Sequence, residues 1–261
     1  MKHSLVICIS ALVFFANVQG ATYVTDFNSF DDQLDVAGQD GWAINDPTVG
    51  LSFIAVAGTK AAALGGYYGD SPLAATVALT HTYGYSLGTT LMSFNFVLVD
   101  SNNIFTARDT FGVTLRNGTS NLFTVYFSPF NQSGTPGADS NGQWNLSYNT
   151  GSDPTVSLTQ GVLEGGYYSF YLQFTPNGSA TDFELKVAGG NTVVRTGNIA
   201  VDPTTLATDF GLTWTPTFGA ANAGSNFLVV DDFSVVPEAS SSLLCLILAT
   251  LVTTHHRRRA C

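Results

Sequence analysis

Cysteine is almost absent from this sequence of 261 residues. The three cysteines, Cys8, Cys245 and Cys261, all lie near the two ends of the chain. The long segment between them therefore contains no disulfide bond, and the burial of apolar side chains must stabilise it. A small domain held together by a disulfide framework is excluded.

Basic side chains are also scarce. Of the 19 acidic and nine basic residues in the chain, 18 and five lie between residues 21 and 236, which gives this segment a formal net charge of −13. Such a charge repels nucleic acid and anionic membrane surfaces, so we expect neither as a partner of this segment. Divalent cations and neutral or cationic polymers are ligands that this negative charge does not exclude. The five basic residues are Lys60, Arg108, Arg116, Lys186 and Arg195.

The residues that most hydrolases need are sparse too. His81 is the only histidine between the two ends, and no motif of a nucleophilic hydrolase surrounds it. No cluster of three or four zinc ligands appears. The only two glutamates there are Glu164, before a Gly-Gly turn, and Glu184, which alternates with apolar neighbours and is expected to face solvent. We therefore expect no enzyme activity, with an exported polysaccharide hydrolase as the alternative.

The N-terminal residues 1–20 have the pattern of a secretory signal peptide. A positively charged start precedes the apolar run 5–15, and small residues follow it. Val18 and Gly20 suit the −3 and −1 positions of a cleavage site, so the mature chain is expected to begin at Ala21. The alternative is an N-terminal anchor that is not cleaved. Either way, the protein is expected to be exported.

Between the ends, the sequence favours β-strands. Glycine, threonine, serine, asparagine, valine and aromatic residues dominate, and helix formers are few. Apolar side chains recur at every second position in two segments, at Met92, Phe94, Phe96 and Leu98, and at Tyr168, Phe170, Leu172 and Phe174. A sheet with one face buried in the core and the other exposed to solvent is typically antiparallel. The predicted strands cover residues 51–56, 74–82, 90–100, 110–116, 122–128, 143–148, 167–175, 182–187, 191–196, 207–213 and 226–235.

Turn residues separate these segments. Asn117-Gly118, Pro176-Asn177-Gly178 and Gly189-Gly190 each predict a turn between two strands. No helical period persists for more than a turn or two. We therefore predict an all-β fold in which residues 21–235 form a single antiparallel β-sandwich of jelly-roll type.

Five aromatic residues lie in or near predicted loops, where they are candidates to stack on sugar rings. The alternative is that they fill the core of the sandwich, as most aromatic residues in such folds do. They are Tyr67, Tyr68, Trp144, Tyr148 and Trp214.

Three aspartates predict a structural calcium site. The first and last strands of a jelly roll commonly lie together, and Asp26 is near one while Asp231 and Asp232 are on the other. Strict alternation would point one of the two adjacent aspartates into the apolar interior, where a carboxylate needs a cation or several hydrogen bonds. Calcium prefers such oxygen ligands. The alternative is that these aspartates cap loops or face water at the sandwich edge.

The layout of residues 21–235 resembles carbohydrate-binding jelly rolls and concanavalin A-like lectins. The resemblance rests on the opening Thr25-Asp26-Phe27-Asn28, the Gly41-Trp42 pair and the closing segment 230–235. It implies the sandwich fold, and a structural calcium at the junction of the first and last strands.

The C-terminal residues 236–261 form a composite tail. A short motif is followed by the apolar run 243–252 and a cluster of arginines, a pattern that holds the chain end on the cytoplasmic side of a membrane. The motif is Val236, Pro237, Glu238 and Ala239, and the arginines are Arg257, Arg258 and Arg259. The tail resembles the PEP-CTERM sorting signal of bacterial exported proteins, although Ala239 stands where the family usually has a second proline. The alternative is a short amphiphilic helix packed on the domain.

The resemblance of the tail implies an exosortase-type processing enzyme as a partner. It also implies a precursor anchored by a short C-terminal transmembrane helix, and a mature protein at the cell surface, in the outer envelope or outside the cell. The function that we expect is therefore an exported, non-catalytic protein that binds polysaccharide. A purely structural or adhesive surface protein is a further alternative.

Overall fold

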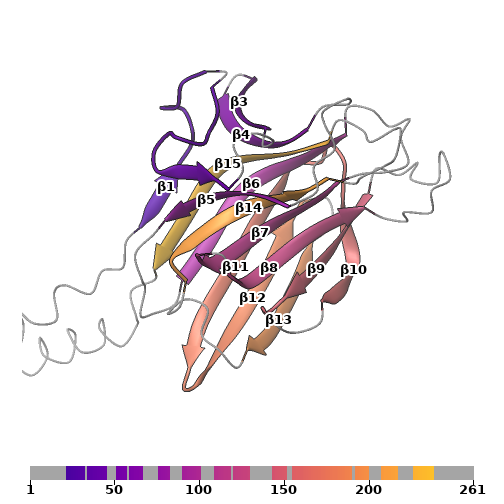
Figure 1. The fold of residues 1–261 in the computed structure, drawn as a ribbon. Coiled ribbons are helices and arrows are strands. Elements are labelled where there is room, and N and C mark those ends of the chain that lie inside the picture. The colour runs from indigo at the N-terminus through magenta and orange to yellow at the C-terminus, as the bar shows by residue number, and fades with distance from the viewer. Residues whose placement is uncertain are drawn as a thin grey trace, which may run out of the picture.

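The structure is a computed structural model that describes residues 22–32, 34–45, 51–57, 59–66, 76–82, 90–100, 109–118, 120–129, 143–151, 155–189, 192–199, 207–216 and 226–237. These residues contain fifteen strands (Figure 1). The predicted signal peptide, residues 1–20, and most of the predicted sorting tail, residues 236–261, lie outside the described residues. Among the residues that are described, no helix has the length and apolar character to cross a membrane.

The strands form two antiparallel sheets. Sheet A has the spatial order β13 (Val193–Ile199), β12 (Ala180–Ala188), β11 (Tyr168–Asn177), β6 (Thr90–Asp100), β15 (Asn226–Pro237), β4 (Thr59–Gly66) and β3 (Leu51–Ala57), and β1 (Tyr23–Thr25) also pairs with β15. Sheet B has the order β10 (Val156–Leu163), β9 (Gln143–Asn149), β8 (Ser120–Pro129), β7 (Thr110–Asn117), β14 (Asp209–Thr215), β5 (Val77–Thr82) and β2 (Trp42–Ile44). The predicted all-β fold with two antiparallel sheets is confirmed.

The alternation read from the sequence sets which face of sheet A is buried. On β6, Met92, Phe94, Phe96 and Leu98 are buried, and the side chains between them are half-buried. On β11 the same period buries Tyr168, Phe170, Leu172 and Phe174. Each of these side chains contributes about 1.5–3 kcal/mol through removal from water.

Aromatic rings join the two sheets through the core. Phe96 of β6 lies 5.0 Å from Phe127 of β8, measured between ring centroids, and Phe174 of β11 lies 5.2 Å from Phe123 of β8. Such tilted and edge-to-face pairs add to the burial of apolar area and fix how the sheets face each other. The core therefore sits between the sheets, as in a β-sandwich.

The beginning and the end of the described chain lie side by side. Strand β1 pairs with the end of β15, where Tyr23 opposes Val235 and Thr25 opposes Phe233, and Figure 1 shows the two strands next to each other. The segment between β1 and β2 closes one end of the sandwich. It inserts three apolar side chains into the core, Phe27, Phe30 and Val36, and Trp42 at the start of β2 adds a fourth.

Candidate functional site

A pocket of about 560 Å³ opens beside β1. Its walls come from β1, the turn that follows it and the loop before β2. The volume falls in the range of small-ligand sites, and several polar groups converge in it. The lining residues are Val24, Thr25, Asp26, Ser29, Phe30, Gln39 and Asp40.

Hydrogen bonds hold Asp40 in place at the wall of this pocket. The Tyr23 hydroxyl donates to Asp40 Oδ2 at 3.0 Å and accepts from Trp42 Nε1 at 2.8 Å. Burial raises the pKa of Tyr23 above its usual range, so the hydroxyl stays protonated and remains a donor. One wall of the pocket is therefore ordered before any ligand arrives.

His81 contacts two residues of the same region, Asp40 and Tyr23. Its Nε2 lies 2.8 Å from the Asp40 carbonyl oxygen, and its ring packs on Tyr23 with 3.9 Å between centroids. Phe210 stacks against the His81 ring, with 5.3 Å between the ring centroids. These contacts give His81 a packing role beside Asp40, Tyr23 and Phe210.

A β-bulge in β15 corrects the expected orientation of Asp231 and Asp232. The pairing of β15 with β6 shifts register between Asp231 and Ser234, and Asp232 adopts a left-handed φ of 51°. The extra residue lets both Val230 and Phe233 point into the core. Strict alternation was therefore the wrong assumption, because neither aspartate points inward: Asp231 is half-buried and Asp232 is exposed.

Neighbouring strands place polar groups around the bulge. Asn95 of β6 donates from Nδ2 to Asp232 Oδ2 at 2.9 Å, and Ser169 of β11 donates from its hydroxyl to Asn95 Oδ1 at 2.8 Å. The backbone N–H of Asp232 donates to Asp231 Oδ1 at 2.8 Å. Amide, hydroxyl and carboxylate groups from three adjacent strands therefore meet at one point on the outer face of sheet A.

Tyr167 lies close enough to the bulge for the charges of Asp232 and Asp231 to act on it. It comes just before β11 and is 62 % exposed. Partial burial and the charges of Asp232 and Asp231 raise the pKa of Tyr167. An accessible ring next to hydrogen-bonding groups is the combination that amphipathic ligands such as sugars use.

The pocket and the bulge meet at Asp26. This side chain lines the pocket, and its charge also acts on Asp231. Partial burial raises the pKa of Asp231, and the charges of Asp232 and Asp26 raise it further. We call the surface formed by the pocket, the bulge and Tyr167 the β1–β15 site.

The aspartates of the β1–β15 site already have hydrogen-bond partners. Both oxygens of Asp26 accept from Asn28, one from the backbone N–H at 3.0 Å and one from Nδ2 at 2.9 Å. Within the described ranges, no group of three or more histidine, cysteine or carboxylate residues is arranged to hold a metal ion. Calcium binding at Asp26, Asp231 and Asp232 stays a prediction.

Three of the aromatic residues chosen as sugar-stacking candidates lie in the core instead. Trp144, Tyr148 and Trp214 are buried between the sheets. Trp214 Nε1 donates to Asp109 Oδ2 at 2.9 Å, a contact that satisfies its polar atom inside the protein. The period of two along β9 and β14 could have shown this from the sequence. The other two candidates, Tyr67 and Tyr68, lie outside the described residues.

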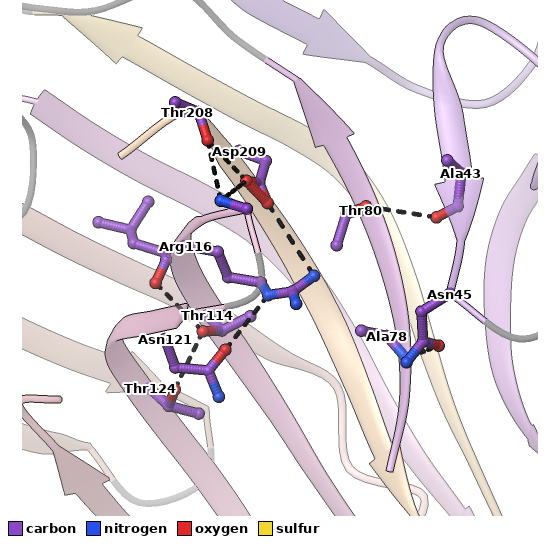
Figure 2. Close-up of polar contacts among 12 residues, drawn as sticks. Ala43, Asn45, Ala78, Thr80, Thr114, Arg116, Asn121, Thr124, Thr208 and Asp209 are labelled. Carbon is purple, nitrogen blue, oxygen red and sulfur yellow. Dashed lines mark hydrogen bonds and ion pairs between the residues drawn. The ribbon is translucent and has the colours of Figure 1, made fainter. Parts of the chain in front are cut away.

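The outer face of sheet B offers little accessible polar surface. Thr114 and Thr124 are 1 % and 2 % exposed, and their hydroxyl oxygens lie 3.0 Å apart. Figure 2 shows this pair near the guanidinium of Arg116, which donates from Nε to Asn121 Oδ1 at 3.2 Å and lies 4.0 Å from Asp209. The polar groups drawn here contact one another.

The first two residues of the predicted sorting motif belong to strand β15. Val236 and Pro237 form the last pairs of β15, opposite Leu91 and Thr90. Glu238 and Ala239 lie outside the described residues, as do Arg257, Arg258 and Arg259.

Comparison with solved structures identifies the fold. Peanut lectin, solved with a 9mer peptide, matches with a TM-score of 0.52 and 12 % identity over 84 % of this chain and 98 % of its own. The CBM2 module of the evolved Dit of Lactobacillus casei BL23 phage J-1 matches with a TM-score of 0.51 and 14 % identity, over 85 % and 99 %. Alginate lyase Aly36B matches with a TM-score of 0.52 and 11 % identity, over 83 % and 96 %. At these identities the likeness shows a lectin-like sandwich fold. No protein-family model and no curated protein matches the sequence.

Proposed function

We propose that this protein is an exported, non-catalytic carbohydrate-binding protein and that the β1–β15 site holds the glycan. The observation that carries the proposal is the exposed ring of Tyr167, which lies within reach of the charges of Asp231 and Asp232 at the bulge, together with a pocket of suitable volume at Asp26. The lectin-like sandwich fold, shared with peanut lectin and a CBM2 module, supports it.

Charge narrows the class of glycan. Asp26, Asp40, Asp231 and Asp232 all belong to the β1–β15 site, and the segment as a whole carries a formal net charge of −13. An anionic polymer such as a uronate would meet like charges here. The site therefore suits neutral glycans and glycans that carry amino groups.

The test is a glycan array probed with the purified protein. Binding to neutral or amino-bearing glycans, with no binding to uronates or sulfated glycans, is the expected result. An array on which nothing binds would favour the structural or adhesive alternative. Preferential binding to uronates would contradict the assignment of the β1–β15 site.

Catalysis is tested separately, because an alginate lyase shares the fold. The protein is incubated with polysaccharides, alginate included, and the release of reducing ends and of unsaturated products is followed over time. We expect neither to rise above a heat-denatured control. Steady product release would establish the enzyme alternative.

Export and sorting complete the proposal. The signal-peptide pattern of residues 1–20 and the composite tail 236–261 support an exported precursor that an exosortase-type enzyme shortens at its C-terminus. Mass spectrometry of the mature protein from a host with such an enzyme should show a species that ends before the arginine cluster. A major species that still ends at Cys261 would remove the processing step from the proposal.

A further inference from the structure

The described residues contain two matched hairpin turns with the dipeptide Asn-Gly. Asn117-Gly118 joins β7 to β8, and Asn177-Gly178 joins β11 to β12; in each hairpin the asparagine pairs with the residue three positions later. Gly118 has a φ of 56° and Gly178 a φ of 67°, and both asparagines are exposed. Open space surrounds both glycines, where an added Cβ would meet no atom within 4 Å. Both glycines are also exposed, so solvent reaches both residues. A third such dipeptide, at residues 141–142, lies outside the described residues.

We propose that Asn177 is a site of spontaneous deamidation and that Asn117 is protected from the same reaction. In this step the backbone nitrogen of Gly178 loses its proton to solvent and attacks Cγ of Asn177. A C–N bond forms, the bond from Cγ to Nδ2 breaks, and ammonia leaves. Water then opens the resulting succinimide at either carbonyl, which leaves aspartate or isoaspartate at position 177. The reaction needs no cofactor or oxidant.

The surroundings of the attacking nitrogen distinguish the two turns. The Gly118 N–H donates to Thr208 Oγ1 and to Asp209 Oδ2, both at 3.2 Å. Removal of this proton would break both hydrogen bonds and leave an electron-rich nitrogen against a buried carboxylate. No such acceptor contacts the Gly178 nitrogen within the described part of the chain. Nucleophilic attack is therefore easier at Asn177.

Asn177 has a weaker form of protection, on its side chain. Its Nδ2 donates to Asp182 Oδ2 at 2.9 Å, and Asn198 of β13 donates to the other oxygen of Asp182 at 2.7 Å. Hydrogen bonds from Asn198 and Asn177 lower the pKa of Asp182. This bond must open before Asn177 reacts, but it lies at the surface and leaves the attacking nitrogen free.

Deamidation would change the turn end of the β11–β12 hairpin in sheet A. A carboxylate at position 177 would replace the donor that faces Asp182 with a like charge. Isoaspartate would also lengthen the backbone by one carbon within a two-residue turn and disturb the pairing of residue 177 with Ala180. The reaction would therefore loosen the hairpin β11–β12 and its contact with β13 as the exported protein ages.

The test uses the full-length protein, held folded at mildly alkaline pH, with Asn117 as the control inside the same molecule. Peptide mapping by mass spectrometry follows the gain of one mass unit at each asparagine, and an isoaspartate-specific methyltransferase labels the main product. We expect Asn177 to react on the order of tenfold faster than Asn117, the factor that hydrogen bonds to a charged acceptor supply. In urea-unfolded protein the two rates should converge. Equal rates in the folded protein, or faster reaction at Asn117, would overturn the proposal.

Two variants separate the two kinds of protection. Asp182→Ala should speed the reaction at Asn177 and leave Asn117 unchanged. Thr208→Ala should speed the reaction at Asn117 and leave Asn177 unchanged. If Asp182→Ala slows Asn177, the carboxylate assists the reaction instead, and the protective role assigned to it is wrong.

Discussion

The outer faces of the two sheets differ in what they present to solvent, although both sheets cover the same core. On sheet B, the face is built from small residues that pack closely: Ala78, Gly112, Thr114, Thr124 and Thr213 are all buried. On sheet A, Tyr171 is 38 % exposed, and it pairs with Lys186 of β12 on one side and with Ser93 of β6 on the other. Side-chain size explains the difference, because glycine and alanine let neighbouring threonines close over the strands.

Charge follows the same division. On the described outer face of sheet B, Arg116 near the end of β7 and Asp209 at the start of β14 lie 4.0 Å apart, and their charges offset each other. On sheet A, Asp231 and Asp232 stand at the bulge, and Lys186 lies 5.8 Å above the ring of Tyr171. One face of the sandwich is therefore closed and nearly neutral, and the other is open and polar. This contrast places the candidate site on sheet A.

The stability of the protein should respond more to a larger side chain on the closed outer face of sheet B than on the open outer face of sheet A. A Cβ at Gly211 would lie 2.6 Å from the backbone oxygen of Leu79, an atom that cannot move without the strand. We expect Gly211→Val to destabilise the protein by about 1–3 kcal/mol, measured by urea unfolding. Thr196→Val, on the exposed outer face of sheet A, should change stability by less than about 0.5 kcal/mol. Equal effects would show that the closed packing of sheet B is not what distinguishes the faces.

The open face should be the one that binds glycan. We expect Tyr167→Ala to weaken binding to an array-selected glycan by about tenfold, because one aromatic contact contributes energy of that order. Tyr126→Ala, which removes the half-buried tyrosine on the outer face of sheet B, should leave the affinity unchanged. Isothermal titration calorimetry measures both, after a melt shows that each variant is folded. The reverse order of effects would move the site to sheet B.

The sequence predicted the strands with a clear alternation of apolar and polar residues in both sheets, and it missed four others. β6 and β11 alternate large apolar and polar residues, so their buried faces could be named in advance. β4 was not predicted, because the run Ala61-Ala62-Ala63 has low β-propensity and forms a strand only between β15 and β3. The short strands β1 and β2, and β10, were also not predicted. Tertiary pairing, rather than local preference, makes these segments extended.

The candidate site was predicted only in part. The sequence indicated Asp26, Asp231 and Asp232, and the pairing of β1 with β15 that brings them together is present. It missed Asn95 and Tyr167, which lie far from the aspartates in the chain. A one-residue bulge reverses the face of every later residue in a strand, and no local signal marked it. The same bulge explains why the carboxylates face outward.

Two aspartates on sheet A should respond to pH with opposite signs. The pKa of Asp231 is raised by burial, so its stabilising contribution is complete below its unfolded pKa and is lost as the pH rises through its folded pKa. Asp231→Asn should therefore raise the melting temperature at neutral pH by roughly 1 °C, a small shift because the side chain is partly solvated, and by nothing in acid.

The pKa of Asp182 is lowered by Asn198 and Asn177, so its contribution is present above its unfolded pKa and is lost as the pH falls through its folded pKa. Asp182→Asn should lower the melting temperature at neutral pH, with the difference vanishing in acid. Shifts of the same sign in the two variants would contradict this assignment.

Calcium should have the smallest effect, and it would act only on the open face. The carboxylates of Asp26, Asp231 and Asp232 are close enough to influence one another, but each accepts a hydrogen bond that a cation would have to replace. We therefore expect weak binding, and a calcium concentration equal to the dissociation constant would stabilise the fold by only about 0.4 kcal/mol. Melts in chelator and in millimolar calcium measure this shift, and Asp231→Ala should abolish it. Asp209→Asn, on the closed face, is the matched control and should leave the calcium shift intact. A melt that calcium does not change would remove the ion from the β1–β15 site, whereas a shift that survives Asp231→Ala would place it elsewhere in the protein.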